Sequence, residues 1–536
     1  MTDRYSLTRR PPFVGNSDRP VYWYDYQTGD VFLAGGKSGK IDCYVPIGEL
    51  LDKIMVHAKS RGMSNDAVYI RSGQLEANRP NESYFHSSLK DWSTVARFSW
   101  KTSHSRYIKG GFTIDLYCTG KFFGEYKNLA NIRNAYFELE EILQHKFKLK
   151  TFKFYSTPAN AGRELLCASL PFDHEYKRLP DDLLELVQTN FGQGRIQVMS
   201  PKHDTLPDGL YLNDGIWMYA ACLNNLPTGE PVHDNVNEFA HVIIRSGPRA
   251  GQVYPHVPGF YRVQATVPTE WNHIGLLKAA MRSKDYNWQY PNEPGQTFES
   301  WATALEIATA INHNWEVEIL ERIIFPNKQT NPLEVWGRKL VELRESLGGD
   351  SEIIELMRYA IRSIMLQAIG SLHRLRNFED RVIYDHEPPP TNPRQWTTIA
   401  QDDSVGSRTI RRRYEPSDYD KAFNHPEWTG AIWGNARARL ANFILDFNIP
   451  YDDIVALSTD CVWTRSYHES VDAECDGKRG SFRMKEHITV KQYHKIMKTS
   501  GDWHWPKTGG EMRDFVEKYN EWKGRYDETV SSSEGD

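Results

Sequence analysis

Residues 455–462 read Val-Ala-Leu-Ser-Thr-Asp-Cys-Val, an apolar run that enters a short polar turn and then resumes. This pattern predicts two antiparallel strands joined by a tight turn, because apolar segments on both sides of a brief polar step are typical of a buried hairpin. The turn carries one acidic side chain, Asp460. A carboxylate held between two buried strands is well placed to bind a divalent cation.

A second acidic strand end lies far upstream. Residues 210–220 read Leu-Tyr-Leu-Asn-Asp-Gly-Ile-Trp-Met-Tyr-Ala, so a strand delivers Asp214, Gly215 permits a turn, and a helix is expected to follow. Taken singly, such an aspartate is more often a helix N-cap than a metal ligand. Two carboxylates brought together from distant strands suit two-metal phosphoryl transfer, so the pair is the candidate catalytic centre.

Length and composition set broad limits. A chain of 536 residues predicts about three or four folding units. No apolar run approaches the ~18 residues that span a bilayer, and no apolar segment follows the basic N-terminus as in a secretory signal. The six cysteines show no Cys-x-x-Cys spacing, which argues against a zinc site and for free thiols. We therefore expect a cytoplasmic protein without membrane insertion.

The charge is uneven along the chain. A net charge of −5 argues against nonspecific nucleic-acid binding by the whole surface. Residues 478–498, however, hold seven basic side chains against one acid, Glu486. This run is either a solvated face or a contact for a phosphate backbone in one groove.

The order of elements predicts a mixed α/β protein. From about 21 to 200, β-rich runs alternate with a helical stretch at 136–147, which indicates a separate α/β domain. Beyond about 330, leucines three and four apart predict a helix, and a second helix from 352 to about 376 would complete a projecting hairpin. A Pro-rich loop at 387–393 and a helix at 430–447 precede the Asp460 turn.

This order resembles the family B DNA polymerases, specifically the protein-primed branch of bacteriophages and linear plasmids. Five stretches carry the resemblance: Phe191-Gly-Gln-Gly-Arg195 is similar to the Tyr-x-Gly-Gly-Arg linker, Asp214–Ala220 to motif A (Asp-x-x-Ser-Leu-Tyr-Pro), Arg362–Gly370 to motif B (Lys-x-x-x-Asn-Ser-x-Tyr-Gly), Ser458–Cys461 to motif C (Asp-Thr-Asp-Ser), and Lys491-Gln-Tyr493 to the Lys-x-Tyr element.

The resemblance implies an RNase H-like exonuclease-type domain followed by a right-hand polymerase. The right hand would have a palm with an antiparallel sheet, helical fingers and a small thumb. The expected boundaries are 1–190 for the exonuclease-like domain, 191–330 for the first part of the palm with an insertion, 331–385 for the fingers, 386–480 for the second part of the palm, and 481–536 for a reduced thumb with a disordered tail.

The resemblance also assigns roles and partners. Asp214 and Asp460 would hold two Mg²⁺ or Mn²⁺ ions while the chain adds dNTPs to a primer 3′-hydroxyl. The expected nucleotide contacts are Tyr219 against the sugar and Arg358, Arg362 and Gly370 from the fingers. The expected template and primer contacts are Gly194, Arg195, Lys491 and Tyr493. The branch implies a terminal protein as a further partner and a host cytoplasm as the location.

Departures from the motifs leave an alternative open. Ser458 stands where motif C has its first aspartate, and Trp217 stands where motif A has serine. In motif B, Leu366, Gln367 and Ile369 replace the asparagine, serine and tyrosine. The alternative is therefore a catalytically impaired polymerase-like protein that binds DNA or initiates replication.

The N-terminal domain departs further. Tyr24-Asp-Tyr-Gln-Thr28 resembles the exonuclease Asp-x-Glu-Thr element with Gln27 in place of glutamate, and Asp91 ends a stretch similar to the second exonuclease element. A neutral amide is a poor ligand for a hard cation. We expect weak or absent proofreading and a degenerate exonuclease site at Asp25, Gln27 and Asp91. An equally good interpretation is that the two aspartates are ordinary surface acids. A nuclease using these acids is a third and weaker reading.

Overall fold

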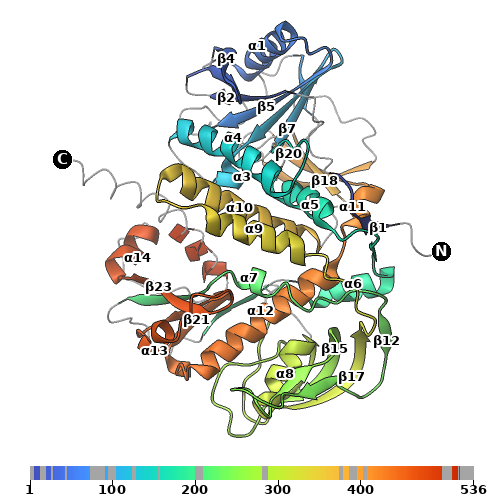
Figure 1. The fold of residues 1–536 in the computed structure, drawn as a ribbon, viewed down its shortest axis with the longest axis vertical. Coiled ribbons are helices and arrows are strands. Elements are labelled where there is room, and N and C mark those ends of the chain that lie inside the picture. The colour runs from blue at the N-terminus through green and yellow to red at the C-terminus, as the bar shows by residue number, and fades with distance from the viewer. Residues whose placement is uncertain are drawn as a thin grey trace.

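The computed structural model shows a mixed α/β chain built from several separate sheets (Figure 1). The structure describes residues 5–11, 20–25, 28–42, 45–72, 91–94, 104–123, 128–154, 157–192, 194–199, 209–279, 288–373, 378–384, 395–402, 407–497, 510–512, 514–516 and 518–519. Within these ranges, no helix combines the length and the apolar character that a membrane crossing requires.

The N-terminal unit is a seven-stranded sheet with helices on both faces, drawn at the top of Figure 1. Its elements are β2 (Val21–Asp25), β3 (Asp30–Leu33), β4 (Gly36–Lys40), α1 (Ile47–Ser60), β5 (Asp66–Ser72), β6 (Ser93–Thr94), β7 (His104–Lys109), β8 (Phe112–Cys118), α3 (Gly120–Phe123) and α4 (Leu129–Lys146). The order is β4-β3-β2-β5-β8-β7-β6, with β2, β5 and β8 parallel. Side chains alternate along β2, so Tyr22 and Tyr24 pack in one core with α1 while Trp23 packs in another with α4.

Two long helices lie between this unit and the rest of the chain (Figure 1). They are α9 (Glu334–Ser346) and α10 (Glu352–Ser371), and α10 packs against α5 (Pro158–Ser169). The approach is close, because a Cβ at Gly162 of α5 would lie 2.5 Å from the Cβ of Ala368. The prediction of a projecting hairpin is therefore wrong, since α10 buries residues against the N-terminal unit as well as against α9.

The central sheet holds both predicted acidic strand ends. It comprises β10 (Arg195–Val198), β11 (Leu210–Gly215), β21 (Ile454–Thr459), β22 (Cys461–Thr464) and β23 (Phe482–Ile488). The strands are antiparallel in the order β10-β21-β22-β11-β23. The hairpin and the upstream strand are thus formed as the sequence pattern predicts, and they are neighbours. The long helix α12 (Pro426–Asp446) packs against α6 (Asp181–Asn190) and the short α7 (Met218–Ala221).

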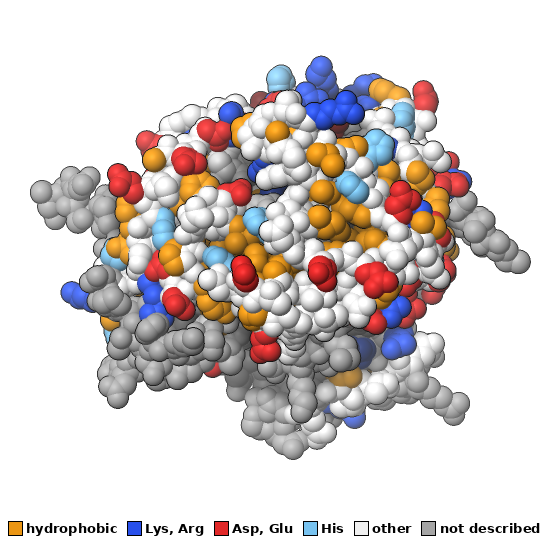
Figure 2. All heavy atoms as spheres, turned by 90° about the horizontal axis from the view of Figure 1, so that it is seen from below, with side chains coloured by type: hydrophobic (Ala, Val, Ile, Leu, Met, Phe, Trp, Pro, Cys, Tyr) orange, Lys and Arg blue, Asp and Glu red, His pale blue; other side chains and the backbone are white. Residues whose placement is uncertain are grey.

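A second antiparallel sheet is inserted between β11 and α9. The inserted segment comprises β12 (Val232–Asp234), β13 (His241–Ile243), β14 (Val253–Pro255), β15 (Gly259–Thr266), β16 (Thr297–Thr303), α8 (Ala304–Asn312) and β17 (Glu316–Ile324). The sheet order is β12-β17-β15-β16, and β13 pairs with β14 as a separate ribbon. Viewed from this end of the molecule, hydrophobic patches and scattered acidic side chains occupy the centre, with the main basic group at one edge (Figure 2).

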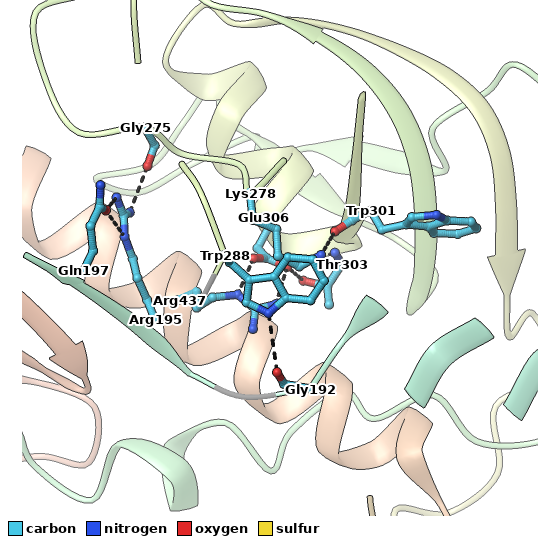
Figure 3. A network of polar contacts seen from close by, with 10 residues as sticks. All are labelled: Gly192, Arg195, Gln197, Gly275, Lys278, Trp288, Trp301, Thr303, Glu306 and Arg437. Carbon is cyan, nitrogen blue, oxygen red and sulfur yellow. Dashed lines mark hydrogen bonds and ion pairs between the residues drawn. The ribbon is translucent and has the colours of Figure 1, made fainter. Parts of the chain in front are cut away.

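A buried network joins the insertion to the central unit (Figure 3). Arg437 of α12 donates from Nε to Glu306 Oε1 at 2.7 Å and from Nη2 to Glu306 Oε2 at 3.1 Å. The buried Lys278 lies over the ring of Trp288 at 4.3 Å, and Trp288 Nε1 donates to the Gly192 carbonyl at 3.5 Å. These contacts connect the insertion to α12 and to Gly192, which precedes β10 of the central sheet.

The remaining elements lie around this centre. They are β1 (Ser6–Thr8), β9 (Glu175–Lys177), β18 (Phe378–Tyr384), β19 (Trp396–Asp402), β20 (Ser407–Arg413), α11 (Asp418–Ala422), the 3₁₀ turn η3 (Tyr451–Asp453), α13 (Glu469–Ala473) and α14 (Val490–Met497). β18, β20 and β19 form a three-stranded sheet. Near the C-terminus, Met512, Phe515 and Tyr519 pack on the outer side of the central sheet. The predicted Pro-rich loop and the predicted tail lie outside the described residues.

Candidate active site

The central sheet brings together the two carboxylates that the sequence singled out. Asp214 ends β11 and stands in register with Cys461 of β22, and the Gly215 amide donates to the Asp460 carbonyl at 2.9 Å. Ligand atoms of Asp214, Asp460 and Cys461 all lie within 4.8 Å of one another. Residues far apart in the chain thus form one compact group of two carboxylates and a thiol.

The backbone of the turn is strained and tightly packed. Thr459 has φ +58°, a conformation that is unfavourable for a β-branched residue. Its hydroxyl donates to Asp460 Oδ1 at 2.9 Å, which fixes the carboxylate. A Cβ at Gly194 would lie 3.1 Å from the Thr459 side chain, and one at Gly215 would lie 3.3 Å from the Asp460 carbonyl. Both glycines therefore let neighbouring backbone reach the turn.

Burial and the neighbouring carboxylate disfavour the ionised form of Asp460. Burial, and next the charge of Asp214, raise the pKa of Asp460, while the Thr459 hydrogen bond, Arg362 and Lys485 oppose that shift. Lys485 Nζ lies 2.9 Å from Asp214 Oδ2. A bulge in the pairing of β11 with β23 places this lysine beside the acid. Sequence reasoning counted Lys485 only as part of a basic run.

Cys461 and Tyr219 complete the immediate surroundings. The Cys461 thiol donates to Asp460 Oδ1 at 3.8 Å, and burial together with both aspartates raises the thiol pKa well above its usual range. Tyr219 lies in α7, partly buried, and its pKa is raised by burial and then by the charge of Asp460. The predicted sugar contact thus lies beside the acidic pair.

The two predicted fingers arginines behave differently. Arg358 donates to Glu355 and to the Leu347 carbonyl, so it secures the turn between α9 and α10. Arg362 is exposed and close enough to Asp460 to influence its pKa. Gly370 is exposed near the end of α10, with open space around its Cα. Of these residues, only Arg362 faces the acidic pair.

The predicted DNA contacts require correction at Arg195 and Tyr493. Arg195 is 2% exposed and donates to the Gly275 carbonyl at 2.8 Å (Figure 3). Its guanidinium lies 3.9 Å from the centre of the Tyr290 ring. The inserted segment covers this arginine, so it has no surface from which to reach DNA. Tyr493 of α14 is buried and stacks on Phe515. Lys491 of the same helix is exposed.

The structure places two of the three predicted degenerate nuclease residues, Asp25 and Asp91. Asp25 ends β2 and accepts from the Thr28 amide at 3.3 Å, which is the contact of a turn-forming aspartate. The Asp91 side chain is 81% exposed and lies 3.6 Å from Lys109 Nζ. Gln27 lies outside the described residues. Among residues that the structure places, the only group of three or more metal-ligating side chains is that of Asp214, Asp460 and Cys461.

Comparisons with known proteins agree with the fold. The structure is similar to phi29 DNA polymerase in a ternary complex with primer-template DNA and incoming nucleotide substrates, with a TM-score of 0.51 and 12% identity over 88% of this chain and 85% of that chain. The post-translocation binary complex with primer-template DNA and an orthorhombic crystal form of the same polymerase match with TM-scores of 0.50, also at 12% identity and over the same shares. No protein-family model and no curated protein sequence matches the chain. At this identity the likeness establishes a shared fold alone.

Proposed function

We propose that the chain is a DNA-directed DNA polymerase of family B, related to the protein-primed branch, that adds dNTPs to a primer 3′-hydroxyl during viral or plasmid replication. The observation that carries this proposal is the meeting of Asp214 and Asp460 on neighbouring segments of an antiparallel sheet. The fold around them is similar to that of a DNA polymerase. Strand ends that present two carboxylates at one edge suit phosphoryl transfer.

The domain assignment follows from this proposal. The N-terminal sheet is an RNase H-like exonuclease-type domain whose nuclease site is degenerate, so proofreading is weak or absent. The central sheet is the palm, α9 and α10 are the fingers, and the segment after β23 is a reduced thumb. A terminal protein supplies the priming hydroxyl, and the enzyme acts in the host cytoplasm.

The donor set fits divalent cations. Asp460 is partly buried, and its carboxylate lies close to that of Asp214, an arrangement that an added positive charge stabilises. Asp214 and Asp460 would hold two Mg²⁺ or Mn²⁺ ions. Such ions lower the pKa of an attacking hydroxyl and stabilise the leaving pyrophosphate.

The chain's own residues perform the remaining tasks. Lys485 balances the charge of Asp214, and the Thr459 hydroxyl orients Asp460. Arg362 is exposed on α10 beside the acidic pair and can bind phosphate oxygens of the incoming nucleotide. Tyr219 lies next to Asp460, where it packs against the sugar and disfavours a 2′-hydroxyl.

One observation favours a second candidate. Ser458, at the place of the first motif C aspartate, is 8% exposed and contributes no carboxylate to the site. The second candidate is a catalytically impaired polymerase-like protein that binds DNA or initiates replication without synthesis.

Primer extension separates the two. The wild type, Asp214→Ala and Asp460→Ala are compared with Mg²⁺ and with Mn²⁺, and primer-template binding is measured in parallel. Asp452→Ala serves as the control, because Asp452 is an exposed acid on the turn before β21. We expect extension by the wild type and the control, and binding without extension by the other two variants. Binding without extension by the wild type selects the second candidate, and equal extension by all four proteins refutes the catalytic assignment.

A further inference from the structure

Three arginines beside the acidic pair lack an ion-pair partner among the residues that the structure places. Arg344 of α9, Arg362 of α10 and Arg483 of β23 make no ion pair with any residue that the structure describes. Burial, and then repulsion from Arg362, lower the pKa of Arg344; the charge of Glu355 opposes this shift, and Arg358 and Arg483 add to the repulsion. Cations that gather from three elements without an ion pair to any described residue indicate a site for a polyanion.

Arg344 is held by an aromatic ring. Its guanidinium carbon lies 4.6 Å from the centre of the Trp217 ring. Trp217 has φ +49° at the N-cap of α7, a left-handed conformation that is rare for a large side chain. The helix that follows it, α7, contacts α9 (Figure 1). The ring also packs against the main core, which anchors it.

The guanidinium of Arg344 has an unsatisfied hydrogen-bond donor within the part of the chain that the structure describes. Arg344 Nε is buried and has no hydrogen-bond partner among the described residues. An aromatic face attracts the charge of a guanidinium but leaves its in-plane N–H groups unsatisfied. A buried donor without an acceptor is unfavourable, and a phosphate oxygen is an acceptor that matches the planar fork of arginine.

We propose that Trp217 and Arg344 form a positioning pair, in which the indole ring holds the guanidinium to bind the triphosphate of the incoming nucleotide. This inference rests on the proposed function. Arg362 lies close enough to both Asp460 and Arg344 for its charge to influence the pKa of each. The cations therefore extend from the acidic pair towards α9. Motif A of the resembling family has serine where this chain has Trp217, so the stack is a property of this chain.

The pair is tested by binding of inorganic triphosphate in Mg²⁺ buffer, measured by isothermal titration calorimetry on the full chain. Arg344→Gln should weaken binding by about 10- to 100-fold, and Trp217→Ser by about 3- to 30-fold. Trp217→Phe keeps an aromatic face and should lose less than Trp217→Ser. Arg338→Gln removes one exposed arginine from the same helix and should leave binding unchanged.

A double variant distinguishes positioning from a general structural effect. In the Arg344→Gln background, Trp217→Ser should weaken binding by no more than about twofold, because the ring then has no guanidinium to hold. An equal loss in both backgrounds, an equal loss in Arg338→Gln, or no binding by the wild type overturns the inference.

Steady-state incorporation separates this inference from the proposed function. If the wild type extends primers, Arg344→Gln and Trp217→Ser should raise KM for dNTP more than they lower kcat, with primer-template affinity unchanged. Extension with an unchanged KM in both variants refutes the positioning pair alone. Weakened triphosphate binding in a chain that never extends a primer supports the pair and refutes the polymerase assignment.

Discussion

Replacement of Glu306 by glutamine is expected to destabilise the junction between the insertion and α12. Glu306 is 2% exposed and accepts two hydrogen bonds from Arg437, which is 3% exposed. It also accepts from the Thr303 amide at 3.0 Å and the Thr303 hydroxyl at 2.9 Å. Glutamine keeps one acceptor oxygen and presents an amide group to these donors, so Arg437 is left as a buried, uncompensated charge.

The expected cost follows from this burial. Removing one partner of a buried ion pair costs about 3–5 kcal/mol, whereas an exposed pair contributes about 0–1 kcal/mol. Glu299→Gln is the matched control, because Glu299 lies 2.8 Å from Arg262 with both side chains more than 40% exposed. The free energy of unfolding is measured in urea by tryptophan fluorescence, to which Trp288 and Trp301 near the network contribute.

The effect should depend on pH in one direction. Burial opposes ionisation of Glu306, but Arg437 and Lys278 outweigh it and hold the pKa below its usual value of 4.5. The ionised carboxylate therefore stabilises the fold above about pH 4.5, and this contribution is lost as the pH falls through the folded-state pKa. The difference between wild type and Glu306→Gln should shrink in acid. If Glu306→Gln lowers the free energy of unfolding at pH 7 no more than Glu299→Gln does, the buried Glu306–Arg437 pair does not stabilise the fold as expected.

Four other changes have defined outcomes. Cys461→Ser should abolish inhibition of primer extension by Cd²⁺, because the thiol is a soft donor within 4.8 Å of both carboxylates; equal inhibition of both proteins contradicts this. Lys485→Met should lower the Tm of the metal-free chain and make Mg²⁺ raise the Tm more than in wild type, since the charge of Asp214 loses its partner; an unchanged Mg²⁺ effect contradicts it. Tyr219→Ala should raise incorporation of ribonucleotides relative to deoxyribonucleotides by roughly tenfold or more, and an unchanged ratio removes Tyr219 from sugar selection. Asp25→Ala should leave degradation of a primer 3′ end at the wild-type level, and a drop would restore a nuclease role to the N-terminal unit.

The strand pattern of the sequence was sufficient to place Asp214 and Asp460 at the ends of buried strands. Apolar runs on both sides of Asp460 and before Asp214 specify buried strands, and burial fixes which residues stand at the turns. The motif order then suggested that the two turns meet. The close approach of Gly194 to Thr459 has a visible signal too, because a glycine directly before a strand often marks close backbone contact.

The role of Arg195 could not be predicted in the same way. Its covering residues, Gly275 and Tyr290, come from the insertion, 80 and 95 residues later, and no local pattern shows that this segment folds back over β10. Tyr493 did carry a signal that was overlooked. Tyr493 and Ile496 are three apart on a short helix and both are buried, which is the spacing of an apolar face.

Arg344 was missed because it follows Leu343 in a leucine-rich helix and reads as part of the solvated side. Its stack on Trp217 joins residues from α7 and α9 that are far apart in the chain. Lys485 was missed because it is a bulge residue, and a bulge shifts the alternation of side chains by one position. In both cases tertiary contacts, rather than local pattern, decide the role.

The claim that Asp214 and Asp460 form one catalytic site is tested most directly by the rate of single-nucleotide incorporation into a primer-template. This rate is measured for Asp214→Asn, Asp460→Asn and the double variant, each with Mg²⁺. Asparagine keeps the shape of each side chain and removes its charge. If the two carboxylates act as one site, each single variant should lose roughly 10³-fold or more in rate, and the double variant should lose little beyond that. A rate of incorporation within tenfold of the wild-type rate by either single variant would contradict a shared catalytic role for the two carboxylates.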